Sequence, residues 1–475
     1  MRGLVWFRRD LRVHDHPALA SALAECDEII PLFVFDDPLL ESRCFGSACV
    51  TFMLGCLRDL AGSLAKHGLR LAWRRGDPVE EIVKAARDLK ADAVYWSRDY
   101  EPAALERDRA VTRQLARHRI VARTFKDHVV FEAGEILSAT GTPLQRYGAY
   151  RKRWWAKWRE APPEILSAPP RKAEAGRTAS SPDLPSPEDL GYKTLPLDFK
   201  PGETEGRRRL DWFLKGLIRD YGTGRNRPAI DGTSRLSPHF RFGTVSSRSA
   251  IHAALEILVR QGAAWRTGIQ TWVDELVWRD FFQQILASFP RVATGPFRPN
   301  GDAPTPRKDA RLYRAWCEGR TGFPLVDAGM RQLNRTGWMH NRVRMVVASF
   351  LVKDLHLDWR QGERYFMEHL LDADLAANNG NWQWCASTGT DAMPGYRIFN
   401  PALQSRKFDP DGDYIRQYVP ELKRVPSKLI HQPELMSAED QDRYRCKVGR
   451  DYPAPVVDHA TAREEYLRGR VRLRA

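Results

Sequence analysis

The chain has 475 residues, enough for roughly two or three domains, and its 75 Lys and Arg against 60 Asp and Glu give a formal net charge of +15. Such a charge attracts polyanions such as nucleic acid, although a basic protein without any such partner carries it too. No stretch approaches about 18 consecutive apolar residues, and the N-terminus does not resemble a signal peptide, so we expect no membrane partner. Seven scattered cysteines argue against a disulfide framework and for a reduced, cytoplasmic location.

The N-terminal part of the chain alternates strand-like and helical segments. The strand-like segments are Gly3–Phe7, Ile29–Phe35, Leu69–Arg74 and Ala93–Trp96. The helical segments between them are Pro17–Cys26, Ser47–His67, Pro78–Lys90 and Ala103–His118. This alternation predicts a doubly wound parallel sheet, which binds ligands at the carboxyl ends of its strands. No Gly-x-Gly-x-x-Gly follows the first strand, so a dinucleotide site of the usual Rossmann type is not predicted there.

A proline-rich stretch separates this part from a helical one. Residues 161–206 contain Ala-Pro-Pro, Ser-Ser-Pro-Asp-Leu-Pro-Ser-Pro and Pro-Gly-Glu-Thr, which predict an irregular surface connector. The segments with helical periodicity after it are Arg207–Tyr221, Ser246–Gln261, Gly268–Ser288, Ala310–Glu318, Pro324–Thr336, Asn341–Leu355 and Arg360–Leu371. We therefore predict an α/β domain over 1–130, an interdomain connector over 131–206 and an all-α domain over 207–475.

The segment 372–400 is unusually polar and aromatic at once. Two acids, three asparagines and two tryptophans lie between Asp372 and Trp384. Buried polar groups need partners, and a buried tryptophan adds an indole N–H that must be satisfied. By itself the segment fits two interpretations equally, a turn between helices with core tryptophans or a pocket for a large, flat, polar-edged ring.

The predicted helix Gly268–Ser288 carries an acid and a cation inside an aromatic stripe. Trp272, Glu275, Trp278 and Arg279 lie within an arc of about 120° at helical spacing. An intrahelical Glu275–Arg279 ion pair is the alternative to a functional role. We favour a stacked ligand ring, because two tryptophans flank the charged pair.

Two further motifs are polar at helix starts. In Gly337-Trp-Met-His-Asn-Arg-Val-Arg-Met, Asn341, Arg344 and Met345 share one helical face while Arg342 points elsewhere. Near Tyr221, the motif Asp-Gly-Thr-Ser-Arg-Leu-Ser-Pro supplies hydroxyls and free amides before a helix, which suit a pyrophosphate. Taken alone, an ordinary Ser/Thr helix cap is the favoured interpretation of this second motif.

The segment Arg151-Lys-Arg-Trp-Trp-Ala-Lys-Trp-Arg159 interleaves cations with aromatic side chains. This composition suits stacking on single-stranded nucleic acid. Trp154, Trp155 and Trp158 could equally anchor a helix, and we favour packing.

Taken together, these motifs resemble the photolyase/cryptochrome family, and most closely its class I cyclobutane pyrimidine dimer photolyases. Three long motifs carry the resemblance: Gly-Thr-Ser-Arg-Leu-Ser-Pro, Trp-Met-His-Asn-Arg-Val-Arg-Met and Asp-x-Asp-Leu-Ala-x-Asn-Asn-Gly-x-Trp-Gln-Trp. It extends from Trp-Phe-Arg-Arg-Asp-Leu-Arg at 6–12 to Asp-Tyr-Pro-Ala-Pro-Val-Val-Asp-His at 451–459. The resemblance implies an N-terminal antenna domain followed by a helical domain that binds FAD.

Matching motif to motif, the resemblance implies the FAD-binding residues. They are Tyr221, Thr233, Ser234, Arg235, Leu236, Ser237, Trp272, Glu275, Arg279, Arg344, Asp372, Asp374 and Asn378. Asn378 is expected at flavin N5, where a neutral amide favours the fully reduced flavin, and Arg344 is expected to pair with Asp372.

The resemblance also implies the substrate, a pyrimidine dimer in UV-damaged DNA that leaves the double helix for a pocket. The implied DNA-binding residues are Arg225, Trp278, Asn341, Arg342, Met345, Trp384 and Gln404. Light is expected to drive an electron from reduced FAD to the dimer, where Glu275 stabilises the added charge, and the electron returns after the ring splits. The implied class is a carbon–carbon lyase, deoxyribodipyrimidine photo-lyase, acting as a monomer without a metal or protein partner.

Two alternatives stay open within the family. A cryptochrome-like blue-light receptor uses the same FAD pocket but usually adds a C-terminal tail and loses dimer-pocket residues, whereas this chain keeps those residues. A (6-4) photolyase carries paired histidines where this chain has Met339-His340-Asn341.

The chain departs from the family pattern at two places. Trp382 and Trp359 match the inner tryptophans of the family's photoreduction chain, but the outer position holds Pro306, so we expect a route through Trp316 or Tyr313 and weaker photoreduction. In the antenna domain, Tyr100-Glu-Pro lacks the Asn-Glu that folate-binding members carry. An 8-hydroxy-deazaflavin or FMN antenna is therefore expected in preference to folate, if an antenna is bound.

Overall fold

The computed structural model describes the whole chain except residues 43, 167–173, 176–182, 299–304 and 473–475. The chain divides into two compact units, which are treated separately here. The first comprises residues 1–219, 234–290 and 371–376, and the second 220–233, 291–370 and 377–475. The units interleave along the chain, and the predicted domain boundaries stay a prediction. Part of the predicted connector lies outside the described residues.

The first unit contains the predicted parallel sheet. Its strands are β1 Arg2–Phe7, β2 Glu28–Asp36, β3 Ala72–Gly76, β4 Ala93–Ser97, β5 Val121–Phe125 and β6 Glu174–Ala175. The order is β3-β2-β1-β4-β5, with β6 beside β2, and every pairing is parallel. The first four strands were predicted, whereas β5 was not, because its side chains are mostly exposed and lack an apolar pattern.

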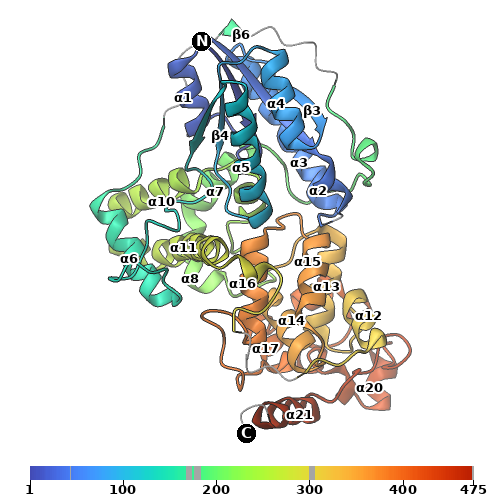
Figure 1. Ribbon diagram of the computed structural model, residues 1–475. Helices are drawn as coiled ribbons and strands as arrows, with labels where there is room; N and C mark the ends of the chain where they lie inside the picture. The colour runs from blue at the N-terminus through green and yellow to red at the C-terminus, as the bar shows by residue number, and fades with distance from the viewer. Residues whose placement is uncertain (43, 167–173, 176–182, 299–304, 473–475) are drawn as a thin grey trace. The chain divides into compact units, whose positions relative to one another are not determined.

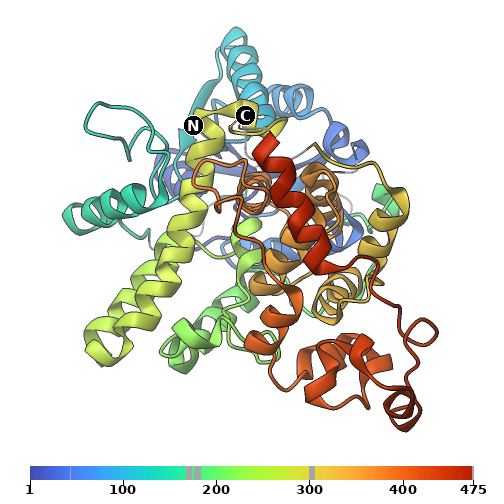
Figure 2. The ribbon, with the colours of Figure 1, turned by 90° about the horizontal axis from the view of Figure 1, so that it is seen from below.

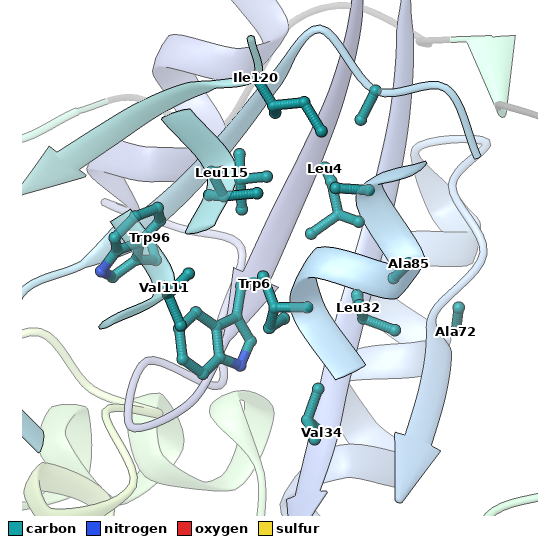
Figure 3. Close-up of a cluster of buried hydrophobic side chains, with 14 residues drawn as sticks. Leu4, Trp6, Leu32, Val34, Ala72, Ala85, Trp96, Val111, Leu115 and Ile120 are labelled. Carbon is teal, nitrogen blue, oxygen red and sulfur yellow. The ribbon is translucent and has the colours of Figure 1, made fainter. Parts of the chain in front are cut away.

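One hydrophobic cluster of this unit lies on one face of the sheet (Figure 3). Trp6 of β1 and Trp96 of β4 are fully buried and tilt against each other, with ring centroids 6.0 Å apart. Ala85 and Leu115, which come from two helices on that face, belong to the same cluster. Burying such large side chains supplies most of the driving force that fixes the strand ends in place.

Helices surround the sheet and continue into a helical layer of the same unit (Figure 1). They are α1 Pro17–Glu25, α2 Asp37–Glu41, α3 Ser47–Lys66, α4 Pro78–Asp88, α5 Pro102–Arg117, α6 Tyr147–Glu160, α7 Glu203–Trp212, α9 Ser237–Arg241, α10 Ser247–Gln261 and α11 Arg266–Ser288. By length and composition alone α3 could cross a membrane, but half of its apolar window is buried, as in the core helix of a soluble domain. The predicted helix Arg207–Tyr221 is wrong in extent, because α7 passes into a π-helical turn at Phe213–Leu217.

The second unit contains helices and no strand among its described residues, as predicted. Its helices are α8 Tyr221–Gly224, α12 Ala310–Glu318, α13 Pro324–Thr336, α14 Asn341–Lys353, α15 Trp359–His369, α17 Pro401–Phe408, α18 Asp413–Tyr418, α19 Ser427–Ile430, α20 Ala438–Arg443 and α21 His459–Arg472. Helix α16, Leu375–Ala386, begins in the first unit and continues in the second. Figure 2 shows this part of the chain from below, in yellow to red.

Candidate functional site

The acidic segment before α16 is anchored in the first unit by buried polar side chains. Asp374 forms an ion pair with Arg9 and accepts a hydrogen bond from Gln283 at 3.3 Å. Arg241 donates to the carbonyl of Ala373. Burial alone would raise the pKa of Asp374, but the neighbouring cations, Arg9 first, outweigh it and hold that pKa far below its usual range. The carboxylate is therefore charged and fixed in position.

Arg279 of α11 belongs to the same network. Its guanidinium lies 2.9 Å from Nδ1 of His128 and donates to the carbonyl of Phe240 at 3.3 Å. Among the described residues no ion pair joins Arg279 to Glu275, so the intrahelical pair given as the alternative does not form. Burial, together with Arg279 and Arg9, lowers the pKa of His128 to about 3, which keeps this ring neutral.

Glycine lets α11 lie close to the chain beside it. A Cβ atom at Gly268 would lie 2.0 Å from the carbonyl oxygen of Ile218, so only glycine fits there. One turn further along, Trp272 is buried against Phe213, with ring centroids 5.4 Å apart. The predicted aromatic stripe thus has its first tryptophan in the core.

The segment after Tyr221 folds back on itself in the second unit. A Cβ atom at Gly232 would lie 2.6 Å from the carbonyl oxygen of Gly224, so the backbone is closely packed there. In the first unit, Arg235 adopts a positive φ of 52°, and Leu236 is buried. Thr233, Ser234 and Ser237 carry hydroxyl groups and Arg235 a guanidinium, which are donors of the kind that a diphosphate accepts from.

In the second unit, α14 holds Arg342 and Met345 together. The guanidinium of Arg342 donates to Oδ1 of Asn226 at 2.6 Å and lies 4.5 Å from the ring of Phe408 on α17. It also approaches Sδ of Met345 at 3.7 Å. Asn341, the first residue of the helix, is exposed. These contacts place three of the predicted DNA-binding side chains at one end of α14.

Helix α15 orients the asparagines of α16. The side-chain amide of Asn378 donates to the carbonyl of Glu363 at 2.9 Å, and that of Asn379 donates to the carboxylate of Glu363 at 2.8 Å. Because the nitrogen of Asn378 is thus engaged, its oxygen is the atom available to accept from a ligand N–H. Burial raises the pKa of Glu363 to about 7.

The two tryptophans predicted to flank a pyrimidine dimer have different surroundings. The ring of Trp278 is stacked on Tyr147 of α6, with centroids 3.5 Å apart and planes 9° apart. Trp384 is half-buried, and its ring has no aromatic or hydrogen-bonding partner among the described residues. One tryptophan therefore offers a single face, and the other is held only by apolar packing.

Trp382 begins a chain of aromatic rings inside the second unit. Its ring contacts Trp316 at 6.2 Å between centroids, and Trp316 contacts Tyr365 at 5.5 Å and Tyr313 at 6.2 Å. Trp359 is buried but makes no ring contact with Trp382 within the described part of the chain. Gly362 admits the Trp382 ring, because a Cβ atom there would lie 2.1 Å from it.

A cavity of about 880 Å³ opens at the carboxyl ends of β1, β2 and β4. This is the point where the strand order of the sheet reverses, the usual ligand position in doubly wound sheets. Arg9 lines it and pairs with Glu101 at 2.6 Å and with Asp99 at 3.5 Å. Trp6 forms part of its wall between two guanidinium groups, of which that of Arg8 lies 4.6 Å from the ring. The cavity therefore suits a flat, polar-edged ligand.

The predicted site residues are distributed over both units. Those in the first are Ser234, Arg235, Leu236, Ser237, Trp272, Glu275, Trp278, Arg279, Asp372 and Asp374. Those in the second are Tyr221, Arg225, Thr233, Asn341, Arg342, Arg344, Met345, Trp359, Asn378, Trp382, Trp384 and Gln404. A single pocket made by both sets, including the Arg344–Asp372 pair, stays a prediction.

Sequence reasoning missed the residues that fix the predicted site residues in position through hydrogen bonds and ion pairs. Arg9, His128 and Gln283 anchor Asp374, and Glu363 orients Asn378. Only Arg9 carried a usable signal, since it follows β1 directly, at the edge where doubly wound sheets bind ligands. The others are single polar residues far away in the sequence.

Two family models match separate parts of the chain. Residues 3–170 match the family DNA photolyase, and residues 272–470 match the FAD binding domain of DNA photolyase. A deoxyribodipyrimidine photo-lyase of Synechococcus is 41% identical over 98% of this chain and 95% of its own length. A class III photolyase from Agrobacterium tumefaciens has a TM-score of 0.91 at 36% identity, covering 100% of this chain and 98% of its own.

A further solved structure is an archaeal photolyase from Sulfolobus tokodaii with two FAD molecules. It is 34% identical with a TM-score of 0.82, covering 99% of this chain and 100% of its own. Full-length relatives at this identity, together with two family matches that span both ends of the chain, leave one conclusion. The chain belongs to the DNA photolyase family.

Proposed function

We propose that this protein is a light-driven repair enzyme that splits cyclobutane pyrimidine dimers in DNA. The observation that carries the proposal is the content of α16. Within seven residues this helix presents an oriented amide at Asn378, a buried ring in an aromatic chain at Trp382 and a half-buried, unstacked indole at Trp384. A flavin, an electron route and a flat substrate need these three features side by side.

The chain's own residues bind and orient the reactants. The hydroxyl and guanidinium groups of residues 233–237 are assigned to the diphosphate of FAD, and FAD when bound supplies the light absorption and the transferable electron. Glu275 is assigned to the thymine edge of the dimer, where its hydrogen bond stabilises developing charge. Trp384 and Trp278 supply the stacking surfaces for the dimer, and Arg342 with Asn341 the polar edge of its pocket.

Electrons for reactivation are assigned to the aromatic chain that begins at Trp382. Trp316 is fully buried, donates its indole N–H to the carbonyl of Val347 at 3.1 Å, and contacts the two partly exposed tyrosines. Pro306 removes the family's outer tryptophan beyond Trp359. The route from Trp382 through Trp316 to Tyr365 or Tyr313 replaces it, with an external thiol as the final reductant.

The strand-end cavity is assigned to an antenna chromophore. Its volume, aromatic wall and charged rim suit a deazaflavin or flavin ring, and the lack of the Asn-Glu motif after Tyr100 disfavours folate. The protein is proposed to act as a monomer in the cytoplasm on UV-damaged DNA, toward which its charge of +15 is favourable.

One assay tests the function. UV-irradiated DNA is incubated with chemically reduced protein in blue light and in darkness, and restored pyrimidines are counted. Repair of cyclobutane dimers in light alone is expected. Binding without repair would favour a cryptochrome-like receptor, and repair confined to (6-4) lesions would favour a (6-4) photolyase, which the residues Met339-His340-Asn341 disfavour.

A further inference from the structure

A second concave site lies in the first unit, between α6, α10 and α11. It is a groove of about 790 Å³. Figure 1 shows α6 beside α10 and α11, away from the sheet. None of the groove's residues lines the strand-end cavity, and none is among the predicted FAD or DNA contacts. The groove falls within the volume range of small-molecule sites.

The α6 wall of the groove is cationic. Gly148, Lys152, Trp155 and Arg159 recur at helical spacing on one face of α6 and line it together. Lys152 and Arg159 are exposed, and within the described part of the chain neither forms a hydrogen bond or an ion pair. Two cations without a local counter-charge at a concave surface attract an anion.

The nearby acid does not cancel this charge. Asp274 accepts from Nε of Arg151 at 2.8 Å and from the indole N–H of Trp155 at 2.9 Å. One guanidinium neutralises this carboxylate, and the second bond fixes the Trp155 ring. Among the described residues, Lys152 and Arg159 therefore form no ion pair and lie on the same helical face as a ring held by a hydrogen bond.

The opposite wall is apolar. Leu255 and Leu258 of α10 are half-buried and line the groove, and their neighbour Val259 is 85% exposed. No atom lies within 4 Å of the position of a Cβ at Gly148, which leaves that end open. A phosphate backbone would gain nothing from leucine side chains, whereas a flat aromatic ring between Trp155 and the leucines would bury apolar surface on both faces.

We propose that this groove binds a planar aromatic anion of mononucleotide size. The ring lies between Trp155 and Leu255, and the phosphate or carboxylate group lies at Lys152 and Arg159. The proposal is independent of the repair function, because it uses no residue assigned to FAD or to DNA. It gives a role to the alternation of cations and tryptophans in the segment 151–159.

The test uses FMN as the probe and its uncharged counterpart riboflavin for comparison. FMN fluorescence is titrated with FAD-loaded protein in an Ala104→Trp background, which fills the strand-end cavity and removes binding there. We expect the protein to quench FMN fluorescence. Riboflavin, which lacks the phosphate and so one ion pair, is expected to bind with about tenfold lower affinity. The double variant Lys152→Ala/Arg159→Ala is expected to lower the affinity for FMN by at least about tenfold. Trp155→Leu is expected to abolish the quenching.

The matched control is Lys84→Ala/Arg87→Ala on α4, which removes the same charge from exposed positions outside both cavities. It should bind FMN like the parent. Equal FMN affinity in parent and in Lys152→Ala/Arg159→Ala would overturn the proposal. The proposal would also be overturned if Lys152→Ala/Arg159→Ala changed only the salt dependence of binding to undamaged DNA. The groove would then be a surface that binds nucleic acid. Since the substituted charges are exposed, FAD content and melting temperature should not change.

Discussion

The rings of Trp316 and Trp382 meet edge to face in the core of the second unit, with centroids 6.2 Å apart and planes 68° apart. The contact is enforced from both sides, because Gly362 leaves room for Trp382 and the carbonyl of Val347 fixes the Trp316 indole. Partly exposed tyrosines lie on the outer side of Trp316. An electron entering from solvent thus has a short aromatic path inward that avoids Pro306.

Replacing Trp316 with Phe should slow photoreduction of oxidised FAD by about tenfold or more, because the ring that carries the charge outward becomes harder to oxidise. Trp382→Phe should have at least the same effect, and Trp359→Phe a smaller one. Transient absorption of the tryptophan radical measures each step, and FAD content checks folding. If Trp359→Phe alone stops photoreduction, the route through Trp316 is wrong. Repair by chemically reduced protein should be unchanged in Trp316→Phe.

Replacing Glu275 with Gln should lower the repair rate by about a hundredfold while FAD remains bound, because a charge-assisted hydrogen bond to the substrate is weakened. Single-turnover repair of a dimer-containing oligonucleotide measures the rate. Glu256→Gln, which removes an exposed carboxylate paired with Arg260 on α10, serves as the control. Normal repair by the Glu275 variant would remove this residue from the mechanism.

Replacing Trp384 with Ala should weaken binding to dimer-containing DNA by about 1–3 kcal/mol, the value of one stacked base. Affinity for undamaged DNA should not change, because the long-range attraction of the basic surface is unaltered. Fluorescence anisotropy with dimer-containing DNA and with undamaged DNA separates stacking on the dimer from the general electrostatic attraction to DNA. Tyr147→Ala, which removes the support behind Trp278, should weaken dimer binding less. Equal losses on both DNAs would show that Trp384 does not contact the lesion.

Filling the strand-end cavity through Ala104→Trp should abolish the absorption of any antenna chromophore and leave FAD content unchanged, because Ala104 lines that cavity. The visible spectrum of purified protein and the wavelength dependence of repair measure the effect. Ala116→Trp, on the exposed face of the same helix α5, is the control. If the Ala104 variant retained a second chromophore, the chromophore would have to bind outside the strand-end cavity.

Glu363 gives the protein a defined pH dependence. Burial raises its pKa from 4.5 to about 7, so between these values the folded state binds more protons than the unfolded state. The free energy of unfolding should therefore fall as pH rises from 4.5 to 7, by at most about 1.4 kcal/mol per pH unit, and should change no further above pH 7. In Glu363→Gln this slope should be reduced. Urea unfolding at pH 5.5, 6.5 and 8 measures the free energy of unfolding of both proteins. If its pH dependence were the same in Glu363→Gln, the raised pKa of Glu363 would be contradicted.

Much of the fold followed from the sequence because periodicity and composition are local signals. The helices Ala310–Glu318 and Pro324–Thr336 end at the predicted residues, since acidic or proline starts and glycine stops mark them. Strand β5 was missed because its exposed side chains carry no pattern. The family motifs predicted Asn378 and Asp374 as site residues, but the residues that hold them could not be found this way: Glu363, which accepts from Asn378, and His128, beside Asp374, have roles that arise only from tertiary contacts.

Arg9 takes part in two sites at once. It lines the strand-end cavity, where Asp99 and Glu101 share its guanidinium, and it also pairs with Asp374 at the head of the segment that leads to Asn378. A chromophore that draws Arg9 into the cavity would change the electrostatic environment of Asp374, and FAD, if it binds at Asp374 as predicted, would change that of the cavity. By thermodynamic linkage, if one cofactor changes the affinity for the other by some factor, the second changes the affinity for the first by the same factor. The two chromophores would then load cooperatively or competitively, with the sign set by one arginine.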